Sequence, residues 1–325
     1  MSGTSTTGRR VGVGIVIAVL SALLATLAGV AIYSAFAPRP ASANPLAGAK
    51  LWVNPASSAS KAVKSDPSIA PIADEAAATW LLPEQHDASR IGSYVGGLVD
   101  QARRSGSWPV FVVYGVPQRD CQAQESAGGT ADDAGYRAWV RAIAASLTAQ
   151  TIVILEPDAL ALSSQCGDRD ARVAQLKAAV GLLKPTGATV YLDAGHSAWI
   201  APGDMAQLLR DAGVDRARGF ASNVSNFEST SDERAYDDAV SADLGGAHYV
   251  IDTSRNGNGP TSDQAWCNPA GRGLGDRPRV VQDGTRLDAT LWIKNPGESD
   301  GSCNGGPPAG QWWPQGAKAL IAGGK

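Results

Sequence analysis

The chain alternates short apolar runs with amphipathic segments. The runs are rich in β-branched and aromatic residues and have the length of strands, and several of the segments between them carry apolar residues at helical spacing. This alternation is typical of an α/β protein with a parallel sheet. We therefore predict an α/β barrel of about seven parallel strands, which begin at Lys50, Pro109, Thr151, Ala188, Arg218, Ala247 and Ala289.

The clearest predicted helix follows Asp132, a residue type that caps helix N-termini. Similar apolar stripes follow Arg90, Asp170 and Asp204. These segments would cover the outside of the sheet. The stripe after Asp132 consists of Tyr136, Trp139, Val140, Ile143 and Leu147.

Polar side chains follow nearly every predicted strand. In the stretch "TIVILEPDAL", Glu156 and Asp158 come directly after a strand of apolar residues, and their spacing puts them on one face of an extended chain. The loops after parallel barrel strands converge on one face, which carries the active site. We therefore expect a cleft at this face. The other polar residues at these positions are Gln118, Arg119, Asp120, Asp193, His196, Asn223, Asn226, Asp252, Arg255, Lys294, Glu298 and Asp300.

A single carboxylate at a strand end often caps a helix or pairs with a basic residue. For Glu156, which lies lower in its strand, we favour this structural interpretation. Several carboxylates at one rim repel one another unless a proton or a ligand compensates. Such a group, in a chain without a metal-binding motif, indicates acid and base chemistry on a neutral substrate.

Tryptophans near the strand ends indicate the same kind of site. Trp52, Trp199 and Trp266 stand beside polar residues, where an indole ring is either a platform for a sugar or part of the core. Three of them near strand ends favour a sugar-binding cleft. We interpret Trp80, Trp108 and Trp139 as packing residues.

The charge distribution argues against a polyanionic partner. Residues 1–43 contain three arginines and no acidic residue, and without them the net charge of the 325-residue chain falls from −3 to −6. An acidic protein repels phosphate backbones, so we expect no nucleic-acid partner. Residues 44–325 contain no repeat or linker and are predicted to form one domain.

Residues 1–43 have the pattern of an export signal. A basic start and a long apolar run precede Ala41, Ser42 and Ala43, which fit a cleavage site. The apolar run, residues 11–37, is also long enough to span a bilayer, so an uncleaved membrane anchor is the alternative. We expect the remainder to be secreted or held at the outer face of the plasma membrane.

Four cysteines lie in the predicted exported part, where oxidation is expected. We predict two disulfides, for which the sequence allows three connectivities. The chain has no CxxC or HExxH motif and three histidines, so we expect no metal and no cofactor. The cysteines are Cys121, Cys166, Cys267 and Cys303.

Seven segments resemble, in order, the motifs of glycoside hydrolase family six, the β-1,4-glucanases. They are "VVYGVPQRDCQAQESAGG", "LEPDAL", "YLDAGHSAW", "SNVSNF", "DTSRNGNGP", "WCNPAGRGLG" and "IKNPGESDGSC". The resemblance runs from Asn44 nearly to the C-terminus. It implies a distorted barrel of seven strands and hydrolysis with inversion at the anomeric carbon.

The resemblance also implies roles for individual residues. Asp158 matches the general acid, and Asp120 matches the carboxylate that helps to keep the acid protonated. Asp300 matches the carboxylate proposed as base, with which an arginine matching Arg255 can pair. The implied substrate-binding or water-holding residues are Trp52, Tyr114, Ser126, Trp199, Trp266, Lys294 and Glu298, and the implied disulfides are Cys121–Cys166 and Cys267–Cys303. From their places after predicted strands we add Asp193, His196 and Asn226 as substrate-binding residues.

The stretch from Cys267 to Cys303 is short, which resembles the open-cleft endoglucanases of the family. We therefore expect a monomer that cuts within β-1,4-glucan chains. One alternative is a glucan-binding wall protein that has lost catalysis. Another is an esterase that uses Ser197, because "GHSAW" is one residue short of the G-x-S-x-G nucleophile motif.

Overall fold

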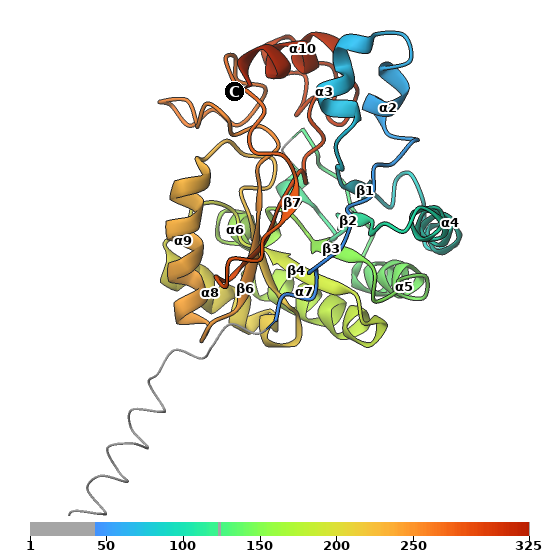
Figure 1. Ribbon diagram of the computed structural model, residues 1–325. Helices are drawn as coiled ribbons and strands as arrows, with labels where there is room; N and C mark the ends of the chain where they lie inside the picture. Colours follow the sequence, from blue (N-terminus) through green and yellow to red (C-terminus); the bar gives the residue numbers. More distant parts are fainter. Residues whose placement is uncertain (1–42, 123–124, 325) are drawn as a thin grey trace, which may run out of the picture. The chain divides into compact units, whose positions relative to one another are not determined.

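A curled sheet of eight strands forms the centre of the computed structural model, which describes residues 43–122 and 125–324. Seven strands run parallel, and β7 pairs antiparallel with β8 at one edge. The predicted α/β fold with about seven parallel strands is confirmed (Figure 1). In spatial order the strands are β1 (Thr79–Leu81), β2 (Val110–Val113), β3 (Ile152–Leu155), β4 (Thr189–Asp193), β5 (Gly219–Ser222), β6 (His248–Asp252), β8 (Leu287–Leu291) and β7 (Arg279–Val280).

The first predicted strand was wrong. The run that begins at Lys50 makes a single bridge, between Leu51 and Trp108, at the start of β2. The first strand of the sheet is instead Thr79–Leu81, which is too short to show a period of two in the sequence. The same limit explains why β7, with two residues, was not predicted.

The two ends of the parallel sheet meet at a narrow seam. Ala77 forms a single bridge with Trp292, just beyond β8, and the indole nitrogen of Trp80 donates to the carbonyl of Ile293 at 2.8 Å. No strand-length ladder joins β1 to β8 among the described residues. The barrel is therefore distorted and only just closed at this side.

Apolar side chains fill both faces of the central strands, as expected for a parallel sheet covered on both sides. Inside the barrel, residues of β2, β3, β6 and β8 pack together with Leu46, which is fully buried. The side chain of Asn44 donates to the carbonyls of Val281 and Asp288 at 2.8 Å. The start of the described chain is thus fastened to the β7 and β8 region.

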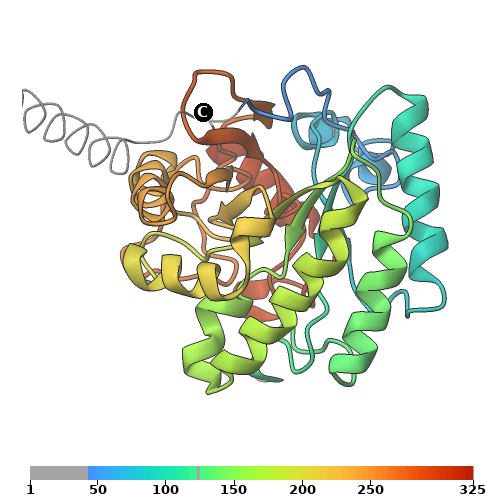
Figure 2. The same cartoon turned by 90° about the horizontal axis from the view of Figure 1, so that it is seen from below.

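Helices cover the outer face of the sheet (Figures 1 and 2). The helix predicted after Asp132 is confirmed: the Asp132 carboxylate accepts from the Gly135 N–H at 2.7 Å, and Tyr136 and Trp139 are buried. The outer helices are α4 (Ile91–Arg104), α5 (Asp133–Ala144), α6 (Ala159–Cys166), α7 (Arg169–Leu183), α8 (Pro202–Asp211) and α9 (Thr230–Asp243).

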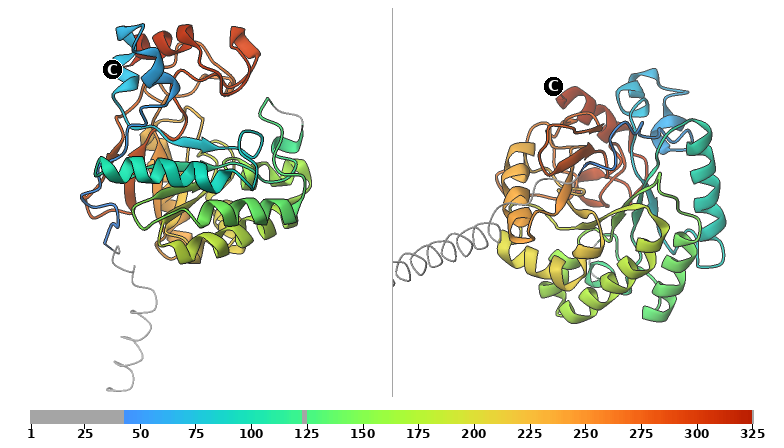
Figure 3. Two further views of the ribbon diagram at one scale, coloured as in Figure 1. Left: turned by 90° about the vertical axis from the view of Figure 1, so that its right-hand side faces the viewer. Right: turned by 60° about the horizontal axis from the view of Figure 1, so that its bottom comes forward.

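Three further helices lie together beyond the carboxyl end of β8 (Figure 3). They are α2 (Ser58–Ala62), α3 (Ala70–Ala73) and α10 (Pro314–Gly323). Ile72 of α3, Ala317 of α10 and Trp292 share a small core. These helices therefore extend one wall of the face on which the strand ends open.

The described residues belong to one compact unit, residues 41–325. Apart from Ala43, the predicted export segment and its apolar run, residues 11–37, lie outside the described residues. Of the helices that the structure describes, none has the length and apolar character needed to cross a bilayer.

Candidate active site

A cleft of about 1150 Å³ lies at the carboxyl ends of the strands, where the sequence predicted it. Its lining comes from both sides of the seam, with Thr79 and Trp80 of β1 facing Lys294 and Asn295 after β8. Of the predicted site residues, the cleft is lined by Tyr114, Asp120, Ser126, Asp158, Trp199, Asn226, Trp266, Lys294, Glu298 and Asp300.

Asp158 stands at the end of β3, at the first turn of α6, with its carboxyl group facing the cleft. Its backbone N–H donates to the Asp193 carboxylate at 2.9 Å. Burial raises the pKa of Asp158 well above its usual range, and the negative charges of Asp193 and Asp120 raise it further. The carboxyl group of Asp158 therefore tends to hold its proton.

Asp120 lies in the turn after β2 and is also buried. Burial raises the pKa of Asp120, while the hydroxyl of Tyr114, which donates to its carboxylate at 2.7 Å, opposes that shift. The guanidinium of Arg119 stacks over the Tyr114 ring at 4.2 Å and donates to the carbonyl of Ser126 at 2.8 Å. Arg119 thus fixes both residues beside Asp120.

The backbone around both carboxylates is strained. Asp120 and Asp158 have φ of 54° and 66°, and Gln118 and Glu156 have φ of 51°. Non-glycine residues in this left-handed region cost on the order of 1–3 kcal/mol each and cluster at functional sites. The surrounding contacts must therefore hold these turns in place.

Glu156 has a structural role, but its partners are backbone N–H groups of a turn and not the helix end or basic residue expected from the sequence. It is fully buried, and its carboxylate accepts from the backbone N–H groups of Gly115 and Val116 at 2.9 Å and 3.2 Å. These bonds fix the turn that follows β2. Glu156 therefore supports the segment that leads to Asp120 and does not line the cleft.

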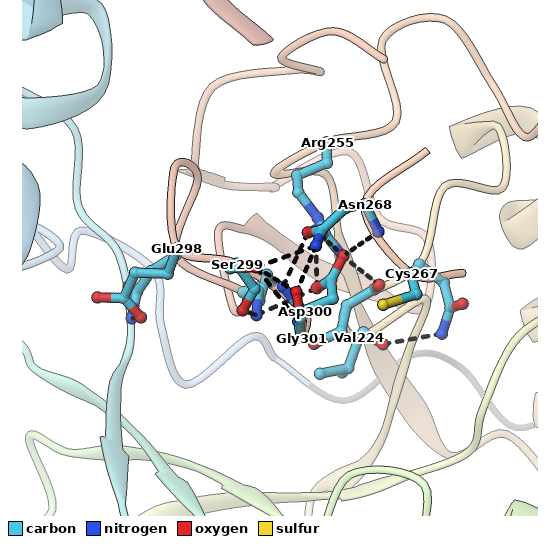
Figure 4. A network of polar contacts seen from close by, with 12 residues as sticks. Val224, Arg255, Cys267, Asn268, Glu298, Ser299, Asp300 and Gly301 are labelled. Atoms are coloured by element: carbon cyan, nitrogen blue, oxygen red, sulfur yellow. Dashed lines mark hydrogen bonds and ion pairs between the residues drawn. The ribbon is translucent and has the colours of Figure 1, made fainter. Parts of the chain in front are cut away.

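Asp300 has the opposite electrostatic surroundings to Asp158 (Figure 4). One guanidinium nitrogen of Arg255 contacts both carboxylate oxygens at 2.9 Å and 2.7 Å, and the Lys294 ammonium lies 3.2 Å away. The backbone N–H of Asn268 donates to the same carboxylate at 3.0 Å. Burial alone would raise the pKa of Asp300, but the charges of Arg255 and Lys294 keep it below its usual value.

Two predicted site residues lie behind the cleft lining. Asp193 is buried and accepts from the N–H groups of Asp158 and Gly195 at 2.9 Å, so it holds the turn that carries Asp158. His196 packs against Trp199 at a ring distance of 5.3 Å, and burial lowers its pKa to about 4. A neutral imidazole here supports the Trp199 ring.

The prediction for Trp52 is corrected by the structure. Its side chain is 6% exposed and packs in the core between sheet and helices, because its strand run lies at the start of β2 and not at the strand ends. Trp80, which we interpreted as packing, lines the cleft instead and packs edge-on against Tyr114 at 5.0 Å. The two tryptophans thus exchange the roles that the sequence indicated.

The sequence also missed Trp312 and Ser58. Trp312 lines the cleft just before α10, and the hydroxyl of Ser58 donates to Glu298 at 2.6 Å. The signal for Trp312 was the Trp312-Trp313 pair close to Gly310, but nothing in the local pattern places it opposite β1.

A second group of acids, also missed, lies on α9 behind Asp193. Glu233 and Asp237 are four residues apart on the helix and both are fully buried. The Ser197 N–H donates to Glu233 at 2.8 Å, and the Ser222 hydroxyl donates to Asp237 at 2.7 Å. Burial raises the pKa of both, and repulsion adds to each shift, from Glu233 on Asp237 and from Glu228 on Glu233.

Both disulfides have the predicted connectivity. Cys121 is bonded to Cys166, which ties the Asp120 turn to the end of α6, and Cys267 is bonded to Cys303, which ties the loop before Asp300 to the loop after it. Within the described ranges, no group of three or more His, Cys, Asp or Glu side chains is placed to hold a metal ion. Ser197, the esterase candidate, does not line the cleft.

Parallel barrels carry their active sites at the carboxyl ends of the strands, and carboxylates held in one cleft there are the kind of groups that cleavage of a glycosidic bond requires. The family model of glycosyl hydrolases family 6 matches residues 41–323, and the chain belongs to this family. The resemblance found in the sequence is thereby confirmed.

Among curated relatives, endoglucanase A of Cellulomonas fimi is 48% identical over 227 residues, which cover 70% of this chain. The match spans half the length of that relative. Endoglucanase 1 of Streptomyces halstedii is 34% identical over 325 residues, covering 94% of this chain and 98% of the relative.

Among solved structures, the endoglucanase Cel6 of Mycobacterium tuberculosis superimposes with a TM-score of 0.83 at 42% identity. The match covers 86% of this chain and 99% of that one, which was solved in complex with methyl-cellobiosyl-4-deoxy-4-thio-β-D-cellobioside. The catalytic core of the cellobiohydrolase Cel6A of Chaetomium thermophilum superimposes with a TM-score of 0.76 at 26% identity, covering 87% of this chain and 99% of that one.

Proposed function

We propose that the protein hydrolyses β-1,4-glucosidic bonds within cellulose or a related β-glucan, in one step that inverts the anomeric carbon. The observation that carries this proposal is the contrast between two carboxyl groups in one cleft. The surroundings of Asp158 favour its protonated form, and those of Asp300 favour the anion. An inverting glycosidase needs one protonated acid and one negative group with room for water between them.

In this mechanism Asp158 donates its proton to the glycosidic oxygen as the bond to the anomeric carbon breaks. A free aspartate would be ionised at neutral pH, so the raised pKa is what makes Asp158 an acid under those conditions. Asp120 contributes through its negative charge, which disfavours a second charge on Asp158.

The attacking water would be held on the opposite face of the sugar, near Ser126 and Asp120. Tyr114 lines the cleft together with Asp120 and Ser126. Its hydroxyl donates to Asp120, so the position of its ring is fixed before substrate binds. As the water attacks the anomeric carbon, Asp300 accepts the proton that the water loses, so the product gains a hydroxyl group at that carbon. Both carboxylate oxygens of Asp300 already accept from Arg255, so its position is fixed before substrate binds.

Internal cleavage is supported by the relatives. Those named endoglucanases are 34–48% identical to this chain, whereas a relative named a probable 1,4-β-D-glucan cellobiohydrolase is 32% identical. Trp80, Trp199 and Trp266 line the cleft and offer ring faces on which sugar rings can stack. A cleft that runs along the seam would admit the middle of a glucan chain.

Export from the cytoplasm belongs to the same proposal. Both disulfides lie in residues 41–325, and structural disulfides form and persist in oxidising compartments. Whether residues 1–43 are removed or remain as an anchor can be decided by sequencing the N-terminus of the exported protein.

The test is to incubate the protein with carboxymethyl-cellulose and to follow viscosity together with reducing ends. A steep fall in viscosity with few new ends is expected for internal cleavage, and proton NMR should first detect the α-anomer of the product. A small fall in viscosity for each new reducing end would indicate attack from chain ends. Binding to cellulose without new ends would favour a non-catalytic glucan-binding protein.

A further inference from the structure

Asn268 makes a closed pair with Asp300. The Asn268 backbone N–H donates to the Asp300 carboxylate at 3.0 Å, and the Asp300 backbone N–H donates to the Asn268 side-chain oxygen at 2.9 Å. Each residue therefore binds the backbone of the other. Figure 4 shows Asn268 beside Asp300, with dashed lines that mark their hydrogen bonds.

The side-chain nitrogen of Asn268 also binds the segment of residues 299–303, which contains Asp300. It lies 3.0 Å from the Ser299 hydroxyl, 2.8 Å from the Gly301 carbonyl and 3.1 Å from the Cys303 carbonyl. All the partners of this side chain thus lie within residues 299–303. Asn268 is 9% exposed and does not line the cleft, so it does not meet the substrate directly.

We propose that Asn268 is a positioning residue, which holds the Asp300 carboxylate against Arg255 and Lys294 and so keeps it an anion. The inference rests on the proposed function, in which that anion takes part. The Asp300 carboxylate can contact Arg255, Lys294 and the Asn268 N–H at the same time only if its orientation is fixed. The reciprocal hydrogen bonds with Asn268 fix the backbone from which this carboxylate projects.

The charged groups that face Asp300 show why its orientation matters. Arg255, after β6, and Lys294, after β8, contact the carboxylate, and Asp158, after β3, interacts with it across the cleft. A rotation of Asp300 away from the two cations would weaken their attraction and leave the effect of burial, which favours the protonated form of the carboxyl group. Its proton affinity would then rise, and the enzyme would lose activity at the acidic end of its range.

The backbone at Asn268 allows a clean test. Asn268 has φ of 48°, a conformation that glycine adopts without strain, so N268G removes the side chain and retains the backbone N–H that binds Asp300. Asn304 offers a matched control. It also has φ of 48°, directly follows the other cysteine of the same disulfide and donates to the Cys267 carbonyl at 2.9 Å, but it does not contact Asp300.

For N268G we expect kcat on carboxymethyl-cellulose to fall about tenfold, as for the loss of a bond that orders a charged group. KM should stay within about twofold, because Asn268 does not line the cleft. The acidic limb of the pH profile of kcat/KM should move to higher pH. N304G should lower the melting temperature by a similar amount while leaving kcat and the pH profile unchanged.

A wild-type pH profile and kcat in N268G would overturn the inference, as would the same changes in N304G. If the wild-type protein releases no reducing ends from glucan, the proposed function fails by itself. The pKa of Asp300 would then be measured in both proteins by carboxyl carbon NMR. A higher pKa in N268G would support the positioning role, and an unchanged one would reject it.

Discussion

Asp158 and Asp300 are chemically identical side chains that the fold places in opposite surroundings. Asp158 has carboxylates for neighbours, and Asp300 has a guanidinium and an ammonium group. Desolvation acts on both, so the sign of the nearby charges decides which one keeps a proton. At the scale of single residues, the chemistry depends on neighbours that come from different strand ends.

Replacing Asp158 with alanine should affect substrates according to their leaving group. Cleavage of cellulose chains should fall by roughly 10²–10⁴-fold, because a sugar alkoxide departs poorly without a proton. A dinitrophenyl cellobioside, whose phenolate leaves unaided, should be cleaved at a nearly normal rate. Initial rates on both substrates measure this, and equal losses would mean that Asp158 is not the acid.

The effect of replacing Asp120 with alanine should not depend on the leaving group in this way. If Asp120 helps to order the attacking water near Ser126, D120A should slow the cleavage of both substrates, since water is needed whatever leaves. Selective loss on cellulose alone would instead assign the acid role to Asp120.

Trp266 should contribute to binding more than to stability. Its side chain is 45% exposed at the edge of the cleft, so W266A should raise KM for cello-oligosaccharides by up to about tenfold and leave the melting temperature nearly unchanged. The control is W139A. Trp139 is 1% exposed, and its loss should cost about 3–5 kcal/mol of stability. Clear destabilisation by W266A with a normal KM would contradict the role in binding.

At the scale of elements, α9 carries a buried acidic pair on the face that it packs against the sheet. Glu233 and Asp237 lie on that face, with Ser197 and Ser222 as neutral partners. Helix α9 therefore supports the turn after β4 through hydrogen bonds, while its buried acids make the fold sensitive to pH.

Glu233→Gln should stabilise the protein at alkaline pH. Burial raises the pKa of Glu233 in the folded chain, so above the ordinary value of about 4.5 unfolding releases a proton, and stability falls as pH rises toward the folded pKa. Glutamine retains an oxygen for the Ser197 N–H and does not titrate. The melting temperature of the variant relative to wild type should therefore be higher at pH 8 than at pH 4.

The exposed Asp243, at the end of the same helix, provides the control for this comparison. D243N should change the melting temperature by a similar small amount at both pH values. A pH-independent difference for Glu233→Gln would show that Glu233 is ionised in the folded protein.

At the scale of the whole molecule, the cleft follows from the weak closure of the sheet. β1 and β8 meet at one bridge, and the residues on either side of it, Trp80 and Lys294, both line the cleft. A complete ladder between these strands would draw the two walls together. The distortion of the barrel and the space in the cleft are therefore one structural feature.

The two disulfides should stabilise the molecule to similar extents and should both affect activity. They close loops with sequence separations of 45 and 36, each worth on the order of 3–4 kcal/mol in the chain-entropy model. Changing either pair to serine should also lower kcat, because one bridge adjoins Asp120 and the other ties together the loops on both sides of Asp300. Melting temperatures under oxidising conditions, measured beside kcat for both double variants, test this, and unchanged melting would show that the bridges add no constraint.

Much of the architecture could be predicted from the sequence because strands and helices follow local patterns. Six of the seven predicted strand runs overlap a strand of the sheet, and the stripe after Asp132 is a helix with the expected cap. Polar residues directly after strands, such as Asp158 and Lys294, indicated the cleft. Parallel topology alone brings those positions to one face.

What the tertiary structure decided depends on contacts between distant parts of the chain. The local pattern around Trp52 and Trp80 cannot tell which one faces the cleft, since that depends on which segment pairs beside β2. In the same way Asn268 and Glu233 look like ordinary surface polar residues until their partners, 30 to 40 positions away, are in place. The periodicity of a sequence reports only on nearby residues. The burial of a side chain and the charges around it depend on residues from distant parts of the chain, which only folding brings together.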